Sequence, residues 1–295
     1  MYRYKEYIFP SLIVHEYHFK GHQGAKGEKR VPKKNITPEQ IQAHNQRHKE
    51  KKVQFLILEN FTKGDYYTTL TYRNGTGKDI GISEVKSDLR AFLDKMRRAY
   101  KRRGTALKFI SRIEKGSEGG THIHLIINRV DDTDLLIDRC WEHGRPHNAL
   151  IDDSDPTMSK LAEYMTKPPS DKAVKKQRAL SDTEDTSKLI AYSCSRNLKR
   201  PVPKEREYSN RNMSRILNAD IKPTEGFYID QDIKPPVKGI NPYNGWSYLT
   251  YQEIRLTKGI KAEPVRFCEC PTCHQFTLNG FICDCYLKKR KRKVT

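Results

Sequence analysis

The sequence predicts an α+β fold, and three observations lead to that prediction. The segment 66–72 is dense in aromatic and β-branched residues, as in a β-strand. Apolar residues in 83–103 recur at spacings of 4, 3, 1, 3 and 4, which places them on one side of a helix. The segments 107–114 and 121–129 resemble two strands joined by a loop rich in turn residues, so we expect them to pair antiparallel.

The other elements are predicted from capping residues and helix-breaking residues. Thr37 is an N-cap residue type, Pro38 suits the first helical position and Gln40 completes a capping box, so a helix is expected up to Lys51. The remaining expected elements are a short helix at 133–142, an extended segment around 145–151, a helix at 156–167 that Pro168 and Pro169 end, and a small strand cluster within 225–256.

Shifts in composition divide the chain into four expected parts. Residues 1–60 form a basic N-terminal extension with one helix, and residues 61–200 form a domain that contains most of the strands and helices named above. Residues 201–262 are expected to be a linker or accessory region. Residues 263–295 form a cysteine-rich module that ends in a basic tail.

The charge of the chain indicates the kind of partner it binds. The 295 residues include 56 Lys and Arg against 36 Asp and Glu, a formal net charge of +20 at pH 7. This excess favours nucleic acid over a merely solvated basic surface, because Lys and Arg that neutralise phosphates release condensed counterions. The sequence contains no run of about 18 apolar residues, so no membrane span is expected. The apolar stretch 8–14 is broken by Pro10 and Ser11 and is no secretory signal, so a cytoplasmic protein is expected.

Five of the seven cysteines lie within eighteen residues near the end of the chain. An odd count without a secretory signal favours a reducing compartment and a metal site over disulfides. The spacing C-x2-C-x9-C-x-C suits a structural tetrahedral Zn²⁺, with unliganded thiols or an iron–sulfur site as alternatives. The expected ligands are Cys270, Cys273, Cys283 and Cys285, and Cys268 or His274 can replace one of them. We expect this module to contact DNA or another protein.

A second candidate metal site comes from the motif His122-Ile123-His124. Alternate residues of a strand project to the same face, so the two imidazoles share one face while Ile123 points to the core. Glu114 lies eight residues before His122, an even separation that lets the two sit opposite each other in an antiparallel pair. This donor set suits Mg²⁺ or Mn²⁺ when phosphate oxygens complete the shell. The alternatives are a solvated sheet face and a surface ion pair between Glu114 and Arg112.

The expected helix at 156–167 carries a candidate nucleophile. Tyr164 and Lys167 lie three residues apart, so the phenol and the ammonium can address one phosphate. A tyrosine is a poor nucleophile unless a metal polarises the phosphate and a base or cation assists. The alternative is a half-buried aromatic residue beside a solvated lysine.

Taken together and in this order, these residues resemble the HUH endonucleases, specifically the rolling-circle replication initiators of phages, plasmids and related mobile elements. The resemblance covers roughly residues 60–200. The matching positions are Thr69-Leu70-Thr71-Tyr72 for the family's first motif, His122 and His124 for the metal motif, Glu114 for the acidic third ligand, Tyr164 with Lys167 for the single-tyrosine nucleophile motif, and 192–198 for a stretch that follows the catalytic domain in phage-type members.

The resemblance implies an antiparallel sheet of about five strands flanked by helices, close to the RNA-recognition fold. It implies that Mg²⁺ or Mn²⁺ at His122, His124 and Glu114 orients the scissile phosphate of single-stranded DNA at a replication origin. Tyr164 then attacks and becomes linked to the 5′ phosphate. The released 3′ hydroxyl primes synthesis by a host polymerase, and a host helicase is a further expected partner. Lys167 would stabilise developing charge or shuttle a proton.

Two other kinds of protein fit part of the pattern. A conjugative relaxase or a transposase uses the same chemistry, and relaxases usually carry the nucleophile near the N-terminus. Tyr2, Tyr4, Tyr7 and Tyr17 are available there, but they lack the helical lysine that accompanies Tyr164. A non-catalytic zinc-containing DNA-binding regulator would explain the charge and the cysteines, but not the combination of histidines, glutamate and tyrosine.

Overall fold

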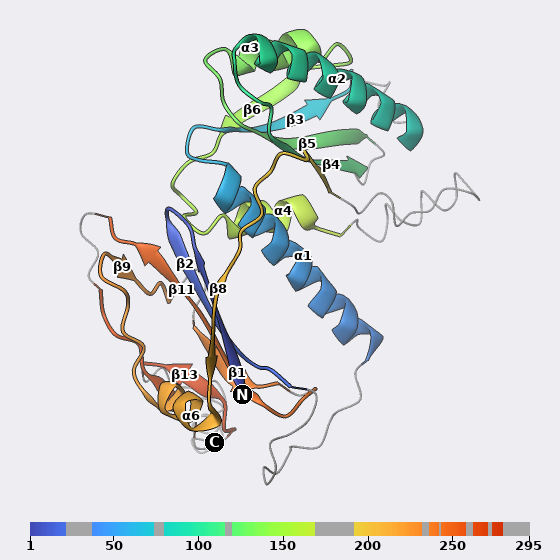
Figure 1. The fold of residues 1–295 in the computed structure, drawn as a ribbon. Coiled ribbons are helices and arrows are strands. Elements are labelled where there is room, and N and C mark those ends of the chain that lie inside the picture. Colours follow the sequence, from blue (N-terminus) through green and yellow to red (C-terminus); the bar gives the residue numbers. More distant parts are fainter. Residues whose placement is uncertain are drawn as a thin grey trace, which may run out of the picture. The chain divides into compact units, whose positions relative to one another are not determined.

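The chain forms two compact units in a computed structural model (Figure 1). The first unit combines Met1–Ile41 with Pro201–Thr295, and the second unit is Gln42–Arg200. The structure describes residues 1–21, 37–73, 80–115, 120–168, 192–231, 236–241, 243–257, 262–270 and 273–279. The second unit therefore contains the histidine, glutamate and tyrosine residues that the sequence analysis singled out.

An antiparallel sheet of five strands runs through the second unit. Its strands are β3 (Tyr66–Thr71), β4 (Phe109–Lys115), β5 (Thr121–Ile127), β6 (Pro146–Leu150) and β7 (Ser193–Cys194). They lie in the order β6–β3–β5–β4–β7, so the central strand β5 pairs with β3 on one side and with β4 on the other. The α+β class, the antiparallel sheet of about five strands and the pairing of the two strands joined by the turn-rich loop are thus confirmed.

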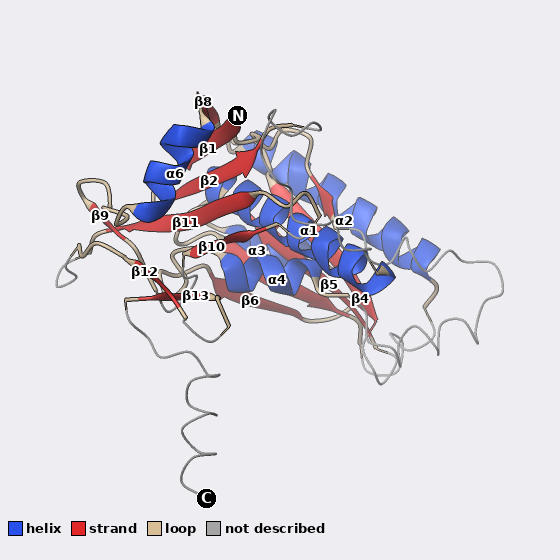
Figure 2. Ribbon diagram, turned by 90° about the horizontal axis from the view of Figure 1, so that it is seen from below, coloured by secondary structure: helices blue, strands red, loops and turns tan. Residues whose placement is uncertain are grey.

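Two helices cover one face of this sheet, α2 (Ile82–Arg102) and α3 (Thr133–Cys140) (Figures 1 and 2). The apolar stripe predicted for α2 is buried, and it packs against Ile123, Leu125 and Ile127 of β5. These three side chains alternate along the strand, as expected for residues that share one face. Their burial removes apolar surface from water and fixes which face of β5 is left for polar side chains.

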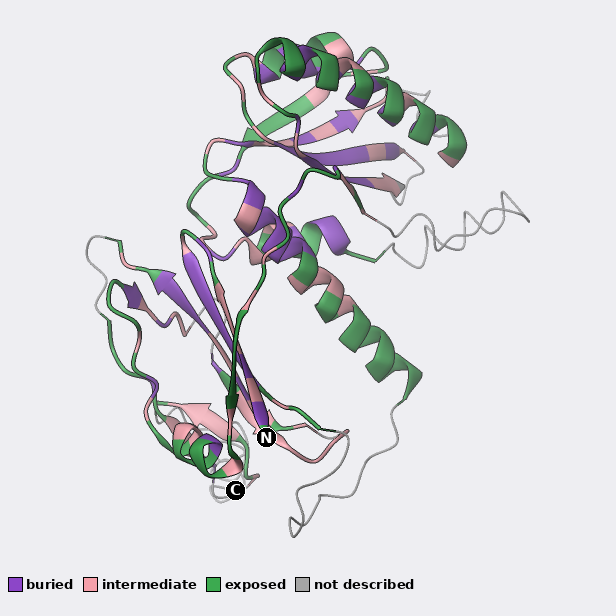
Figure 3. Ribbon diagram, viewed as in Figure 1, coloured by how far each residue is buried: buried purple, intermediate pink, exposed green. Residues whose placement is uncertain are grey.

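Two further helices, α1 (Pro38–Asn60) and α4 (Ser159–Thr166), pack on the opposite face (Figure 1). Ile57 of α1 and Met165 of α4 are fully buried there together with Ile126 of β5. Figure 3 shows that burial in α1 is confined to its C-terminal half, the part that lies on the sheet. The sheet is therefore a central layer between two helical layers.

Helix α1 begins as the sequence predicts but is longer than expected. The backbone N–H of Thr37 donates to Oε1 of Gln40 (3.1 Å), and the N–H of Gln40 donates to Oγ1 of Thr37 (3.3 Å), which completes the capping box. The helix continues past Lys51 to Asn60, because residues 53–58 are all buried and gain more from packing than from ending the helix. No helix in the described part of the chain is both long enough and apolar enough to cross a membrane.

The first unit contains a second antiparallel sheet. Its strands are β1 (Tyr2–Ile8), β2 (Leu12–Phe19), β8 (Lys204–Tyr208), β9 (Phe227–Tyr228), β10 (Val237–Ile240) and β11 (Ser247–Arg255). The strands β10, β11, β2, β1 and β8 are neighbours in that order, and β9 also pairs with β11. The helix α6 (Asn210–Asn218) contributes the fully buried Met213 to a core that includes Tyr2, Tyr4 and Tyr17.

This sheet differs from the expected division into four parts. Residues 1–60 were expected to be an extension and 201–262 a linker or accessory region, yet β1 pairs with β8, and β2 pairs with β11, so segments of both parts share one sheet. The physical reason is that β1 and β2 find their remaining partners far along the chain, where no local pattern identifies them. The strand cluster expected within 225–256 is present as β9, β10 and β11.

The central position of Ile123 makes it a sensitive test of this fold. The Ile123→Ala variant loses buried apolar groups and leaves a cavity between β5 and α2, so we expect its free energy of unfolding to fall by about 2–5 kcal/mol. Chemical denaturation of the full chain, followed by circular dichroism, measures the loss. Leu135→Ala is the control, because Leu135 is 52% exposed on α3 and its truncation should change stability by less than about 0.5 kcal/mol. Equal losses in the two variants would contradict this packing.

Candidate active site

The two histidines of β5 lie on the sheet face that α1 and α4 cover. Ile123, between them, and Leu125 are fully buried on the opposite face, as predicted. Glu114 of β4 lies directly opposite His122 in the ladder, which confirms the register deduced from their separation. Two residues further along β5, His124 projects from the same face as His122.

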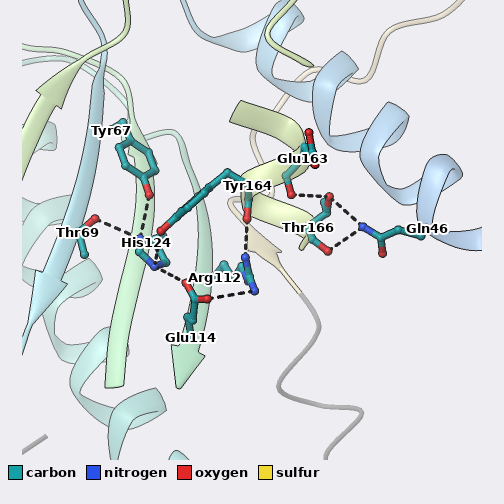
Figure 4. Close-up of polar contacts among 9 residues, drawn as sticks. All are labelled: Gln46, Tyr67, Thr69, Arg112, Glu114, His124, Glu163, Tyr164 and Thr166. Carbon is teal, nitrogen blue, oxygen red and sulfur yellow. Dashed lines mark hydrogen bonds and ion pairs between the residues drawn. The ribbon is translucent and has the colours of Figure 1, made fainter. Parts of the chain in front are cut away.

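His124 is the centre of a network of polar contacts, which Figure 4 shows. Its Nε2 lies 2.9 Å from Oε2 of Glu114 and 3.4 Å from the hydroxyl oxygen of Tyr164. Its Nδ1 lies 2.9 Å from the hydroxyl oxygen of Tyr67 and 3.1 Å from Oγ1 of Thr69. The imidazole is buried, so these contacts fix both its position and the direction of each ring nitrogen. Glu114 thus makes its hydrogen bond with His124 and not with His122 opposite it.

The hydroxyls of Tyr67 and Thr69 suit either tautomer of His124, because a hydroxyl both donates and accepts hydrogen bonds. If Nε2 carries the proton and donates to Glu114, Nδ1 accepts from a hydroxyl; if Nε2 gives its lone pair to a cation, the Nδ1–H donates instead. Burial raises the pKa of Tyr67, so this phenol keeps its proton. Sequence reasoning did not assign Tyr67 to the site, although its alternation with Thr69 places it on the same face of β3.

Glu114 is held in its ionised form. The hydrogen bond from His124 and the charge of Arg112 lower the pKa of its carboxyl group, against the opposing effect of burial. Nη2 of Arg112 lies 3.9 Å from Oε1 of Glu114, and the Arg112 side chain is only 3% exposed. The pair is therefore no ordinary surface ion pair. Arg112 also donates through Nη1 to the backbone carbonyl of Tyr164, which ties β4 to α4.

Tyr164 reaches the network from α4. Ala162 and Met165 are buried in the core, while Tyr164 is 40% exposed and meets His124 edge-on with 5.0 Å between ring centroids. The carboxylate of Asp155 accepts from the N–H of Lys160 (2.7 Å) and so satisfies a free donor in the first turn of this helix. The arrangement leaves the Tyr164 side chain partly exposed, with its hydroxyl within reach of an imidazole nitrogen.

Lys167 follows the last residue of α4 and is exposed. Its charge contributes to the lowered pKa of Glu114, as the smallest of the causes. Within the described residues it makes no hydrogen bond or ion pair, so the structure places its ammonium group near the network but not in contact with it.

His122 is the least engaged of the expected metal ligands. Burial is the main cause that lowers the pKa of His122, against the opposing effect of the Glu114 carboxylate, and this favours the neutral imidazole, the form that binds metals. Its Nδ1 is buried without a hydrogen-bond partner among the residues described. A neutral imidazole with an unused nitrogen, a second imidazole and an ionised carboxylate form a donor set that suits Mg²⁺ or Mn²⁺.

The chemistry of these donors fits a divalent ion, while their arrangement is not that of a closed metal centre. No three His, Cys, Asp or Glu side chains converge into such a centre in the part of the chain that the structure describes. His122, His124 and Glu114 as ligands of one ion therefore stay a prediction.

The cysteine cluster falls only partly within the described residues. A hairpin of β12 (Phe267–Glu269) and β13 (Phe276–Leu278) carries Cys268 on its first strand and has Cys270 and Cys273 in its turn. Hydrogen bonds shape that turn: the N–H of Cys270 donates to the carbonyl of Gln275 (2.9 Å) and the N–H of His274 to that of Cys270 (2.9 Å). The other two expected ligands, Cys283 and Cys285, lie outside the described residues.

Metal analysis of the purified full chain tests the zinc prediction. We expect about one zinc ion per chain, as a four-thiolate site binds. Cys270→Ser and Cys273→Ser should each lower the zinc content, while Cys140→Ser, a change on α3, should leave it unaltered. A chain without zinc, in which the cysteines at 268–285 all titrate freely under native conditions, would contradict the assignment.

A family model of known proteins matches the part of the chain that forms this site. Residues 65–169 match the family model of the replication-associated protein ORF2. The match begins just before β3 and ends just after α4, so it includes His122, His124, Glu114, Tyr164 and Lys167. A comparison of the chain with curated proteins finds no match.

Proposed function

We propose that the chain is a replication initiation endonuclease, which nicks single-stranded DNA at a replication origin and so starts rolling-circle replication. One observation carries the proposal: the hydroxyl of Tyr164, a residue that is 40% exposed, lies 3.4 Å from Nε2 of His124. Both residues lie within the match to the replication-associated protein family. A hydroxyl beside an imidazole and a carboxylate is a suitable arrangement for nucleophilic attack on a phosphodiester.

In the proposed reaction, the hydroxyl of Tyr164 gives up its proton to solvent, and the resulting phenolate oxygen attacks the scissile phosphorus. The new bond links the tyrosine to the 5′ phosphate, and the bond from phosphorus to the 3′ oxygen breaks. That oxygen takes a proton and becomes the 3′ hydroxyl that a host polymerase extends, with a host helicase as the other expected partner. Arg112 holds the backbone of Tyr164 in place, and Lys167 would stabilise negative charge on the phosphate.

The proposal assigns the metal to three side chains of β4 and β5. His122, His124 and Glu114 would hold Mg²⁺ or Mn²⁺, which when bound supplies positive charge that polarises the scissile phosphate. The low pKa values of His122 and Glu114 support this role, because both groups are then in the form that can donate electron pairs.

The other candidate tyrosines are less suitable as nucleophiles. Tyr2, Tyr4 and Tyr17 are 4%, 6% and 8% exposed in the core of the first unit, so a DNA strand cannot reach their hydroxyls. Burial also raises the pKa of Tyr17, to about 12, which disfavours its phenolate. Tyr7 is half-buried, and burial raises the pKa of its phenol as well. These observations support Tyr164, and hence the initiator, over a relaxase with an N-terminal nucleophile.

The test is an incubation of the full chain with single-stranded DNA and Mn²⁺, followed by a denaturing gel. A covalent adduct that runs with the protein, and that a chelator prevents, is the expected result. If no single-stranded substrate yields an adduct while DNA binding persists, the chain is a non-catalytic DNA-binding protein and the proposal is wrong.

The same assay measures the contribution of Lys167. Lys167→Ala should slow adduct formation about tenfold without abolishing it, because the exposed ammonium stabilises charge without contacting the network. Lys52→Ala, an equal loss of charge at an exposed position of α1, should leave the rate unchanged. An unaltered rate in Lys167→Ala would remove this residue from the site.

A further inference from the structure

A large groove lies on the face of the five-stranded sheet that points away from the candidate active site. It has a volume of about 1080 Å³ and runs between α2, β4 and the segment 193–197. Its floor is apolar and includes Leu89 and Leu93 from α2 and Phe109 and Ile113 from β4. All of these side chains belong to the second unit and lie in or against its core.

The walls of this basic groove carry five cations and, among the described residues that line it, no Asp or Glu. Lys86, Arg90, Arg97 and Lys101 follow one another along α2 at spacings of 4, 7 and 4, which places them in one row on the helix. At 1.5 Å per residue, the row extends over about 22 Å. Arg196 stands at the β7 side of the groove.

Four of these five cations are unpaired within the described residues, and all five are exposed. Arg97 is the exception, because it pairs with Asp94 and its guanidinium lies 5.7 Å from the centroid of the Phe109 ring. Neighbouring cations repel one another, and a bound anion would reduce this repulsion. The groove is thus prepared for a ligand with several negative charges.

The shape of the groove narrows the choice of anion. One phosphate or one nucleotide would engage one or two of the cations and leave the rest of the row unused. Single-stranded DNA carries a phosphate at every nucleotide and exposes flat bases, which can rest on an apolar floor and against guanidinium planes. The row of cations and the apolar floor therefore fit single-stranded DNA better than a small anion or an acidic peptide.

The position of the groove connects it to the candidate active site through β4. Alternate residues of this strand point to opposite faces: Ser111 and Ile113 line the groove, while Arg112 and Glu114 belong to the site. The two-residue strand β7 pairs with β4 and forms the edge of the sheet. A DNA strand that leaves the site past β7 reaches the groove without crossing the sheet.

We propose that the basic groove binds the single-stranded DNA that flanks the cleaved phosphate; the link to a cleaved phosphate rests on the proposed function. The test uses the full chain with Tyr164→Phe, so that no covalent product forms. Fluorescence anisotropy measures its affinity for a labelled oligo(dT) of about 20 nucleotides over a range of salt concentrations. The groove variant adds Lys86→Gln, Arg90→Gln and Lys101→Gln.

A matched control removes three cations from the other flank of α2 and from α3. It carries Arg98→Gln, Arg102→Gln and Arg139→Gln, which line a separate cavity of about 400 Å³. Each phosphate contact on a single strand contributes about 0.7 to the slope of log K against log salt concentration. Because the groove variant lacks three cations, the magnitude of this slope should fall by about 2. Its binding should be at least about tenfold weaker near 0.1 M salt. The control should keep nearly the full slope.

Three results would overturn the proposal: an unchanged slope in the groove variant, equal losses in the two variants, or equally tight binding of polyglutamate. The adduct assay on chains with Tyr164 intact keeps this test apart from that of the proposed function. If an adduct forms but the two variants show no slope difference, only the proposal for the groove is wrong. If the slopes differ but no adduct forms, the proposed endonuclease activity is wrong and the groove is still a DNA-binding surface.

Discussion

Replacing Tyr164 with phenylalanine is expected to abolish the covalent DNA adduct. The change removes only the oxygen that would attack the phosphate, which lies 3.4 Å from Nε2 of His124. The ring that remains keeps its edge-on contacts with Tyr67 and His124, so folding and DNA affinity should be nearly unaffected. The denaturing-gel assay with single-stranded DNA and Mn²⁺ measures the adduct, and fluorescence anisotropy measures the binding.

Tyr66→Phe is the matched control for this variant. Tyr66 lies on β3, one residue from Tyr67, and its side chain projects from the opposite face of the sheet. This control should form the adduct at the rate of the unmodified chain. Peptide mapping of the trapped adduct then locates the nucleotide. An adduct at Tyr2, Tyr4 or another tyrosine of the first 17 residues would replace the initiator by a relaxase-like enzyme.

The second large effect is expected for His124→Ala. The imidazole joins Glu114, Tyr67, Thr69 and Tyr164, so its removal deletes one expected metal ligand and the organising centre of the site. Metal-dependent cleavage should fall at least about a hundredfold, as for the loss of a group that stabilises transition-state charge. DNA binding should be largely kept, because it depends on the basic surface of the chain.

Because His124 is buried, His124→Ala also leaves polar groups without partners, at an expected cost in stability of about 1–3 kcal/mol. His124→Gln retains a hydrogen-bonding side chain, and it should remain folded and still fail to cleave. His143→Ala is the control for loss of an imidazole, since His143 pairs with Asp88 and packs on Trp141, away from the network. Full nicking by both His124 variants would exclude this histidine from the metal site.

Much of the candidate site was predictable because it depends on periodicity alone. The alternation in β5 puts His122 and His124 on one face and Ile123 on the other whatever surrounds the strand. A short connection between β4 and β5 then leaves few registers, and the one with Glu114 opposite His122 is observed. The helix that carries Tyr164 was likewise visible from the prolines that follow it.

The tertiary structure decided what covers these elements. Arg112 would be a surface residue on an isolated hairpin, but α4 packs beside it, so its charge is buried between Glu114 and the carbonyl of Tyr164. The same packing directs Glu114 toward His124. Side chains lean according to their neighbours on adjacent elements, and a register specifies only which backbone positions face each other.

The sequence by itself determined the local features: the alternation of β5, the apolar stripe of α2 and the capping box of α1. It also determined the net positive charge. Only the tertiary structure decided which distant segments meet. Aromatic and charged residues alternate over Tyr2–Lys5, yet the partners of this segment in β8 lie near residue 206. The row of cations on α2 becomes one wall of a groove only because the 193–197 segment pairs beside β4. Strand pairing is specified by shared burial and by closure of long loops, and neither leaves a signal within a short stretch of sequence.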